Sequence, residues 1–209
     1  MRNATRLVSA VIFSAGLIFG QYKAEPAGAP PAELAAGVRS AMQQQGVKVS
    51  GNGVTVEVWF CATEPTGPKS TESDVTLPNI PQGALVGALR VSGNYSDRRG
   101  QTIKPGVYTL RYSNYPVNGD HQGVAPQRDF LLLVPAANDS DPASTPNFDA
   151  LVAMSKKASG TPHPAVLSCW KSDDGTKPGL SQSGDTDWVV NGLLGKEMIS
   201  LIVIGTASS

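Results

Sequence analysis

Residues 47–61 alternate apolar and polar side chains on both sides of a Gly-Asn-Gly segment at 51–53, and this pattern constrains the fold most strongly. A period of two places successive side chains on opposite faces of a strand, and glycine and asparagine tolerate the positive φ of a tight turn. The pattern predicts a β-hairpin. One face of its second strand carries Val54, Val56, Val58 and Phe60, and the other carries Glu57, Trp59 and Cys61.

Six further segments have the length and composition of strands, and two others have those of short helices. The 22 glycines and 16 prolines, set against 16% charged residues, indicate many turns and little helix. The first helix is predicted at 32–45, and the second begins with Thr145 as N-cap and ends at Gly160. The expected fold is mainly β, an antiparallel β-sandwich (immunoglobulin-like or jelly-roll-like) with two short helices. The predicted strands are 84–91, 106–113, 128–134, 165–171, 187–194 and 198–204.

The first residues have the features of a secretory signal peptide. Arg2 and Arg6 precede an apolar run of about 14 residues, which is too short to cross a bilayer comfortably. We therefore expect a signal peptide at 1–24, cleaved between Gly20 and Ala27, although an uncleaved anchor is an alternative. A flexible tether rich in Pro, Ala and Gly would follow at 25–31, and a single domain at 32–209. The product is expected to be extracytoplasmic, periplasmic or secreted, with no stable membrane span after cleavage.

The charge balance argues against nucleic acid as a partner. Cleavage after Ala24 would remove three of the 17 basic residues and leave 14 against 17 acidic ones, a net charge of −3. Replacing the counterions of a phosphate backbone needs a basic patch or stripe, and none is visible in the sequence. An extracytoplasmic ligand or protein is the expected partner.

Cys61 and Cys169 are the two cysteines, and each lies on a predicted strand beside a tryptophan. In an oxidising compartment an even pair indicates a disulfide. This disulfide would close a loop of more than 100 residues and would stabilise the fold by about 4–5 kcal/mol in the chain-entropy model. The alternative is two separate buried thiols. With His121 and His163 the cysteines lack the compact spacing of a metal clip, so neither a metal nor a cofactor is expected.

Two polar loops carry the candidate ligand-binding residues. The loop at 114–127 contains Asp120, His121 and Gln122, which could bind a hydroxylated ligand or act in acid/base chemistry. The loop at 92–104 contains Arg98 and Arg99, which could bind a carboxylate or a sugar acid. The alternative is that both loops only supply turn geometry and solvated charge.

The segment 100–112 contains the motif Pro105-Gly-x-Tyr-x-Leu110, in which a Pro-Gly turn leads into a strand. It resembles a strand-entry phrase that is common in secreted bacterial β-sandwich proteins. The stretch onward to Pro135 is similar to families of exported bacterial proteins with no assigned function. The resemblance implies export and a β fold, and it implies no active site.

The sequence leaves three functions open. The first is a non-enzymatic β-sandwich that binds a ligand, glycan or protein through the loops at 92–104 and 114–127. The second is a metal-assisted or acid/base hydrolase that uses Asp120 and His121, with His163 as a third candidate. The third is a structural envelope protein. The chain lacks a Gly-x-Ser-x-Gly elbow, a phosphate loop and a dinucleotide fingerprint, which favours the first function and leaves enzymatic activity uncertain.

Overall fold

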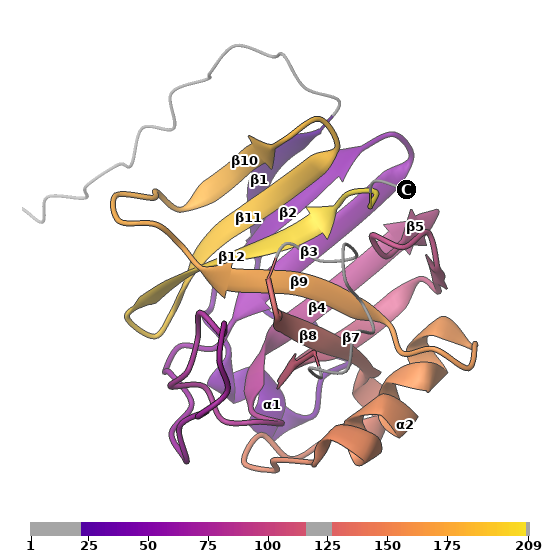
Figure 1. The fold of residues 1–209 in the computed structure, drawn as a ribbon. Helices are drawn as coiled ribbons and strands as arrows, with labels where there is room; N and C mark the ends of the chain where they lie inside the picture. The colour runs from indigo at the N-terminus through magenta and orange to yellow at the C-terminus, as the bar shows by residue number, and fades with distance from the viewer. Residues whose placement is uncertain (1–21, 116–126, 208–209) are drawn as a thin grey trace, which may run out of the picture.

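The computed structural model describes residues 22–115 and 127–207, and within them one antiparallel sheet of ten strands dominates (Figure 1). The strand order is β1-β2-β3-β4-β7-β8-β9-β12-β11-β10. The strands of this sheet are β1 (Lys23–Gly28), β2 (Gly46–Gly51), β3 (Val54–Phe60), β4 (Leu85–Gly93), β7 (Gly106–Asn114), β8 (Asp129–Pro135), β9 (Val166–Lys171), β10 (Gly179–Ser183), β11 (Asp187–Leu194) and β12 (Glu197–Ile204).

Three smaller groups of elements complete the fold. A two-stranded hairpin consists of β5 (Tyr95–Ser96) and β6 (Thr102–Ile103). The helices are α1 (Ala36–Ala41) and α2 (Phe148–Ser159), and a single 3-10 turn, η1, spans Ala136–Asn138. No helix in the described part of the chain is long and apolar enough to pass through a bilayer.

The sheet curls until its two edge strands, β1 and β10, approach each other, which gives a barrel-like shape (Figure 1). The mainly β class, the antiparallel pairing and the two helices are therefore as predicted. The predicted β-sandwich, which would consist of two sheets packed face to face, is not confirmed. Here one continuous sheet wraps around its own core instead, and the right-handed twist of long sheets favours such curling.

The core lies on the concave face of this sheet, and strand register explains which side chains fill it. Val58 lies opposite Leu89, and Leu110 lies opposite Leu133, so apolar side chains meet across neighbouring strands. The predicted face of Val54, Val56, Val58 and Phe60 is buried as a unit. Each such side chain contributes about 1.5–3 kcal/mol of transfer free energy when fully buried.

Helix α2 covers part of the convex face. Along β8, alternate residues point outward, and Phe130, Leu132 and Val134 form a second apolar cluster with Leu151 of the helix. The helix begins two residues later than predicted, because the Asn147 side chain, not Thr145, accepts the capping hydrogen bond, from the amide of Ala150 at 3.0 Å. Its end at Gly160, with φ +68°, agrees with the prediction.

Helix α1 is much shorter than the predicted 32–45. The predicted apolar stripe is buried, with Val38 at 0% and Met42 at 1% exposure. The helix stops because the backbone after Ala41 pairs with the end of β3: Met42 bridges Cys61, and the Gln43 amide donates to the Phe60 carbonyl at 2.9 Å. Tertiary pairing therefore overrides local helical periodicity here.

The segment predicted as a flexible tether, 25–31, is instead ordered structure. Its first part belongs to β1, which pairs with β2 along Lys23–Gly28 and forms an ion pair from Glu25 to Lys48 at 2.9 Å. The two prolines at 30 and 31 are buried. The composition was misleading because Pro26 is tolerated on an edge strand, where one side of the backbone needs no ladder partner.

Candidate ligand-binding site

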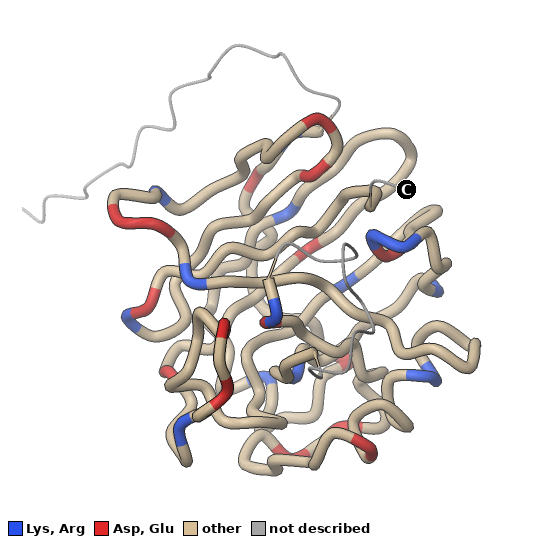
Figure 2. Tube along the Cα trace, viewed as in Figure 1, with Lys and Arg blue, Asp and Glu red and all other residues tan. Residues whose placement is uncertain are grey.

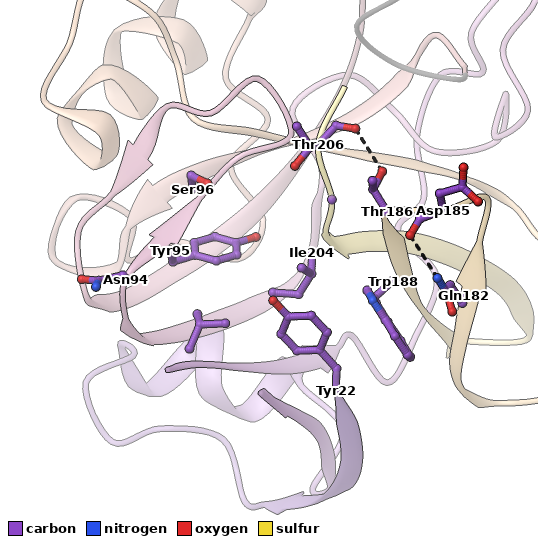
Figure 3. A pocket seen from close by; sticks show the side chains of 12 residues that line it. Tyr22, Asn94, Tyr95, Ser96, Gln182, Asp185, Thr186, Trp188, Ile204 and Thr206 are labelled. Atoms are coloured by element: carbon purple, nitrogen blue, oxygen red, sulfur yellow. Dashed lines mark hydrogen bonds between the residues drawn. The ribbon is translucent and has the colours of Figure 1, made fainter. Parts of the chain in front are cut away.

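A cavity of about 660 Å³ opens where the two edges of the sheet come together at one end of the barrel (Figure 3). Segments far apart in sequence build it: the residue before β1, the start of β3, the β5 strand, the β10–β11 turn and the end of β12. Its lining consists of Tyr22, Val54, Asn94, Tyr95, Ser96, Gln182, Asp185, Thr186, Trp188, Ile204, Gly205 and Thr206.

Aromatic side chains form the apolar part of this cavity. Tyr22 and Trp188 are half-buried, and their ring centroids are 5.5 Å apart at an interplanar angle of 61°. Trp188 pairs with Ile204 next to a bulge in β11, and bulges commonly redirect side chains beside binding sites. Tyr95 is buried behind them, with its hydroxyl donating to the Val203 carbonyl at 2.8 Å. Figure 3 shows these rings arranged around Ile204.

Uncharged polar side chains form the rim. Asn94, Ser96, Gln182, Thr186 and Thr206 are all exposed. Backbone carbonyls hold two of them: Gln182 Nε2 donates to the Asp185 carbonyl, and Thr186 Oγ1 donates to the Thr206 carbonyl, each at 3.1 Å (Figure 3). Among the described residues of this lining Asp185 is the one that carries a charge, and they include neither lysine nor arginine.

The two arginines predicted to bind a ligand lie outside this cavity and pair with the protein's own carboxylates. Arg98 forms an ion pair with Asp187 at 2.9 Å, and Arg99 forms one with Asp97 at 2.8 Å. Arg99 also donates to the Pro164 carbonyl at 2.7 Å. These contacts fasten the β5–β6 hairpin to β11 and to the segment before β9. The hairpin loop does reach the cavity, but through its neutral residues.

The remaining candidate residues of the sequence analysis have no part in this description of the cavity. Asp120, His121 and Gln122 lie outside the described residues. His163 is exposed in the connection between α2 and β9. Among the residues that are described, no cluster of three or more His, Cys, Asp and Glu side chains could hold a metal ion.

The predicted disulfide between Cys61 and Cys169 is absent, and both are buried free thiols. Cys61 follows β3 and Cys169 lies in β9, so β4, β7 and β8 separate them in the sheet. Cys61 Sγ instead donates to the Leu85 carbonyl at 3.5 Å. The sequence could not reveal that the two cysteines are apart, because their positions in the chain do not show how many strands lie between them in the sheet.

We expect both thiols to resist alkylation in the native protein. Burial raises the pKa of Cys61 to about 12 and that of Cys169 well above its usual value, and a raised thiol pKa leaves little reactive thiolate at pH 8. Iodoacetamide at pH 8 should modify neither cysteine in the native state and both after denaturation. An intact mass two protons short would contradict the free thiols, and rapid native labelling would contradict their burial.

The residues of this cavity were missed by the sequence analysis for two reasons. Tyr22 fell within the predicted signal peptide, and Trp188 was assigned only to a strand. The usable signal was the run of polar residues at 181–187 directly before a tryptophan, which is typical of a loop with an aromatic side chain at its end.

Comparisons of the chain with protein-family models, with curated proteins and with solved structures find no match in any of the three.

Proposed function

We propose that this is an exported protein that binds a neutral carbohydrate in the cavity between its sheet edges. The observation that carries the proposal is the combination of the Tyr22 and Trp188 rings with a rim of neutral amides and hydroxyls. In ligand-binding sites, apolar and aromatic surface supplies contact area, and polar groups fix the orientation of the ligand. The loop at 92–104 contributes Asn94 and Ser96 to the lining, which supports a part for this loop in binding.

The chemistry of a sugar matches both parts of the cavity. A pyranose ring has faces made of C–H groups, which pack against aromatic rings, and an equator of hydroxyls. Amide and hydroxyl side chains both donate and accept hydrogen bonds, so they can pair with a hydroxyl in either role. Asn94, Gln182 and Thr186 stand at the rim where such hydroxyls would lie.

The charges favour a neutral ligand over an acidic one. A phosphate or uronic acid is ordinarily held by arginine or lysine. The lining supplies neither, and the carboxylate of Asp185 would repel an anion. Along the backbone trace, basic and acidic residues are interspersed instead of gathered in one region (Figure 2). This arrangement supports a ligand recognised by shape and hydrogen bonds.

Export is the second part of the proposal. It is supported by the basic start and apolar run of residues 1–20, which have the pattern of a secretory leader. An exported protein would also encounter extracellular polysaccharides and their fragments, which are the ligands proposed for this cavity. Expression of the full chain in a Gram-negative bacterium, followed by cell fractionation, tests this part: we expect the protein in the periplasm, and a full-length chain that stays in the cytoplasm would contradict export.

Replacing Trp188 with alanine should abolish or strongly weaken carbohydrate binding. The test is a titration with maltohexaose, cellohexaose and chitohexaose, in which binding is measured by calorimetry and by tryptophan fluorescence. We expect at least one neutral oligosaccharide to bind and Trp188→Ala to weaken it about tenfold or more, since stacking contributes about 0.5–1.5 kcal/mol and 1.4 kcal/mol is tenfold. Trp188→Phe should retain most of the affinity.

The matched control is Trp170→Phe, which removes a half-buried tryptophan of β9 that does not line the cavity. Polygalacturonate serves as the acidic comparison and should bind more weakly than the neutral oligosaccharides. The proposal is wrong if none of the neutral oligosaccharides binds, or if Trp188→Ala folds and binds like the wild type.

A further inference from the structure

We infer that the ion pair between Arg98 and Asp187 positions one wall of the proposed carbohydrate cavity, and that it acts through residues 205–207, here called the strap. The inference rests on the proposed function, because its main readout is the affinity for carbohydrate. It gives Arg98 a role in binding without contact with the ligand: Arg98 and Asp187 lie outside the lining, and residues close to both of them in the chain belong to it.

One peptide unit of the strap is held from two directions. The carbonyl of Thr206 accepts a hydrogen bond from Thr186 Oγ1 at 3.1 Å, in the turn between β10 and β11 (Figure 3). The amide of the same peptide unit, which belongs to Ala207, donates to the Arg98 carbonyl at 2.7 Å, in the loop of the β5–β6 hairpin. The strap therefore bridges two loops that are far apart in the chain.

The ion pair joins the same two loops directly. Arg98 Nε donates to the two carboxylate oxygens of Asp187, at 3.0 and 3.1 Å, and Arg98 Nη2 lies 2.9 Å from Oδ2. The two side chains are 18% and 11% exposed, so solvent and salt screen this pair less than a fully exposed one. Together with the two hydrogen bonds of the strap, the ion pair closes a ring of contacts, and loss of one contact would loosen the others.

The strap passes close to the carboxylate within this ring. A Cβ atom at Gly205 would overlap Asp187 Oδ1 and would lie 3.2 Å from the Ile202 side chain. Glycine is therefore required at position 205 because another group approaches its backbone closely. Replacement of Gly205 with alanine should push the strap away from the carboxylate and disturb the ion pair.

The ring positions polar groups of the cavity. Four residues of the lining belong to the ring or lie within two positions of the ion pair in the chain: Ser96, Thr186, Gly205 and Thr206. Thr186 has one hydroxyl proton and donates it to the Thr206 carbonyl, so toward a ligand this hydroxyl can act only as an acceptor. A displaced strap would free that proton and change the hydrogen bonds that this part of the rim offers.

The test is a double-mutant cycle on the affinity for maltohexaose, cellohexaose and chitohexaose. Ala207→Pro removes the amide hydrogen that the strap donates and changes no charge, and Arg98→Gln removes the ion pair. We expect each variant to weaken binding about three- to tenfold. The double variant should bind no more weakly than the weaker single variant, because both changes release the same peptide unit. Arg98→Lys keeps the charge and should recover part of the affinity.

Two further measurements separate positioning from a general loss of stability. Hydrogen exchange followed by NMR needs no ligand: Arg98→Gln should speed exchange of the Ala207 amide and leave the amides of β7 and β8 protected. Gly205→Ala should speed the same exchange with both charges still present. The matched control is Arg90→Gln, which removes an arginine paired with Glu57 at 3.3 Å outside the lining and should leave the affinity unchanged.

The outcomes distinguish this inference from the proposed function. If the wild type binds a neutral oligosaccharide and Arg98→Gln binds it equally well, or if the losses of the two single variants multiply in the double variant, the positioning role is wrong and the proposed function stands. Unchanged exchange of the Ala207 amide in Arg98→Gln overturns the positioning role with or without a ligand. If the wild type binds none of the oligosaccharides, the proposed function fails, and the role of the ion pair in carbohydrate binding fails with it.

Discussion

Replacing Arg111 with alanine should lower the free energy of unfolding by about 3–5 kcal/mol, because it leaves a buried carboxylate without its partner. The side chains of Arg111 and Asp139 are 0% and 3% exposed. Two hydrogen bonds join them, from Nε to Oδ2 at 2.8 Å and from Nη2 to Oδ1 at 2.7 Å. This bidentate geometry is the strongest form of the arginine–carboxylate pair.

The same guanidinium holds the segment after β8 against β7. It donates to the carbonyl groups of Gly83, at 3.1 Å, of Asp141, at 2.7 Å, and of Ser144. In the alanine variant these carbonyls would lose the guanidinium as a donor, and Asp139 would keep the hydrogen bond from the Thr109 hydroxyl but lose both from the guanidinium, in a place that water reaches poorly. Arg111→Lys should recover only part of the loss, because an ammonium cannot reproduce the planar fork.

Urea denaturation followed by tryptophan fluorescence measures this effect. The matched control is Arg39→Ala, at an exposed contact with the Ala32 carbonyl at 3.5 Å, which should change the free energy of unfolding by no more than about 0.5 kcal/mol. A loss below about 1 kcal/mol for Arg111→Ala would contradict the large cost expected for a buried Asp139 carboxylate without the guanidinium.

Replacing Asp129 with asparagine should cost about 2–4 kcal/mol, although the two side chains have nearly the same shape. Asp129 is 0% exposed. Its Oδ2 accepts from the amide of Thr76 at 2.8 Å and from the Thr76 hydroxyl at 2.9 Å. Its Oδ1 accepts from the amide of Leu77 at 3.1 Å and from the hydroxyl of Tyr112. An amide nitrogen in place of either oxygen would face donors with a donor.

Tyr112 remains a donor at every ordinary pH. Burial is the main cause that raises its pKa, and the hydrogen bond to Asp129 and the charge of that carboxylate add to it. A phenol with a raised pKa stays protonated as the solution becomes basic, so the Tyr112 hydroxyl keeps its proton for Asp129, while its oxygen already accepts a hydrogen bond from Asn114 Nδ2 at 2.9 Å.

Thermal unfolding and hydrogen exchange test the Asp129→Asn variant. Besides a lower Tm, we expect faster exchange at the amide of Thr76 or of Leu77, whichever of the two faces the new amide nitrogen and loses its acceptor. Asp174→Asn makes the same chemical change at an exposed residue and should leave both measurements unaltered. Unchanged protection at 76 and 77 in the Asp129 variant would contradict the proposed anchoring of this segment.

The hydrogen-bond networks around Arg111 and Asp129 show why some buried charged residues cannot be recognised from the sequence. In β7, Thr109, Arg111 and Ser113 alternate with core residues and therefore read as a solvent-facing stripe. All three are buried, because the segment after β8 folds back over this face. Nothing local to β7 signals that cover. The covering residues lie about 30 positions away, and their contact depends on the path of the chain after β8.

The candidate site likewise has some features that could be predicted from the sequence and others that depend on tertiary contacts. Its loop at 92–104 was predicted from polar composition, and it does reach the cavity. Its two arginines, Arg98 and Arg99, form ion pairs with Asp187 and Asp97, and it is the neutral Asn94 and Ser96 that line the cavity. Which polar residues of a loop face a ligand depends on which of them find partners inside the protein, and those partners come from distant segments.

By itself, the sequence determined the elements whose signals are local. Alternation located the β2–β3 hairpin and the main strands, and Gly160 marked the end of α2, because strand and helix periodicities and turn geometry depend on neighbouring residues. Only the tertiary structure decided that one sheet curls on itself, that the cysteines stay apart, that β1 belongs to the domain, and that Tyr22 meets Trp188. These features depend on strand order and curvature, which arise from pairings between residues far apart in the chain and leave no periodic trace in it.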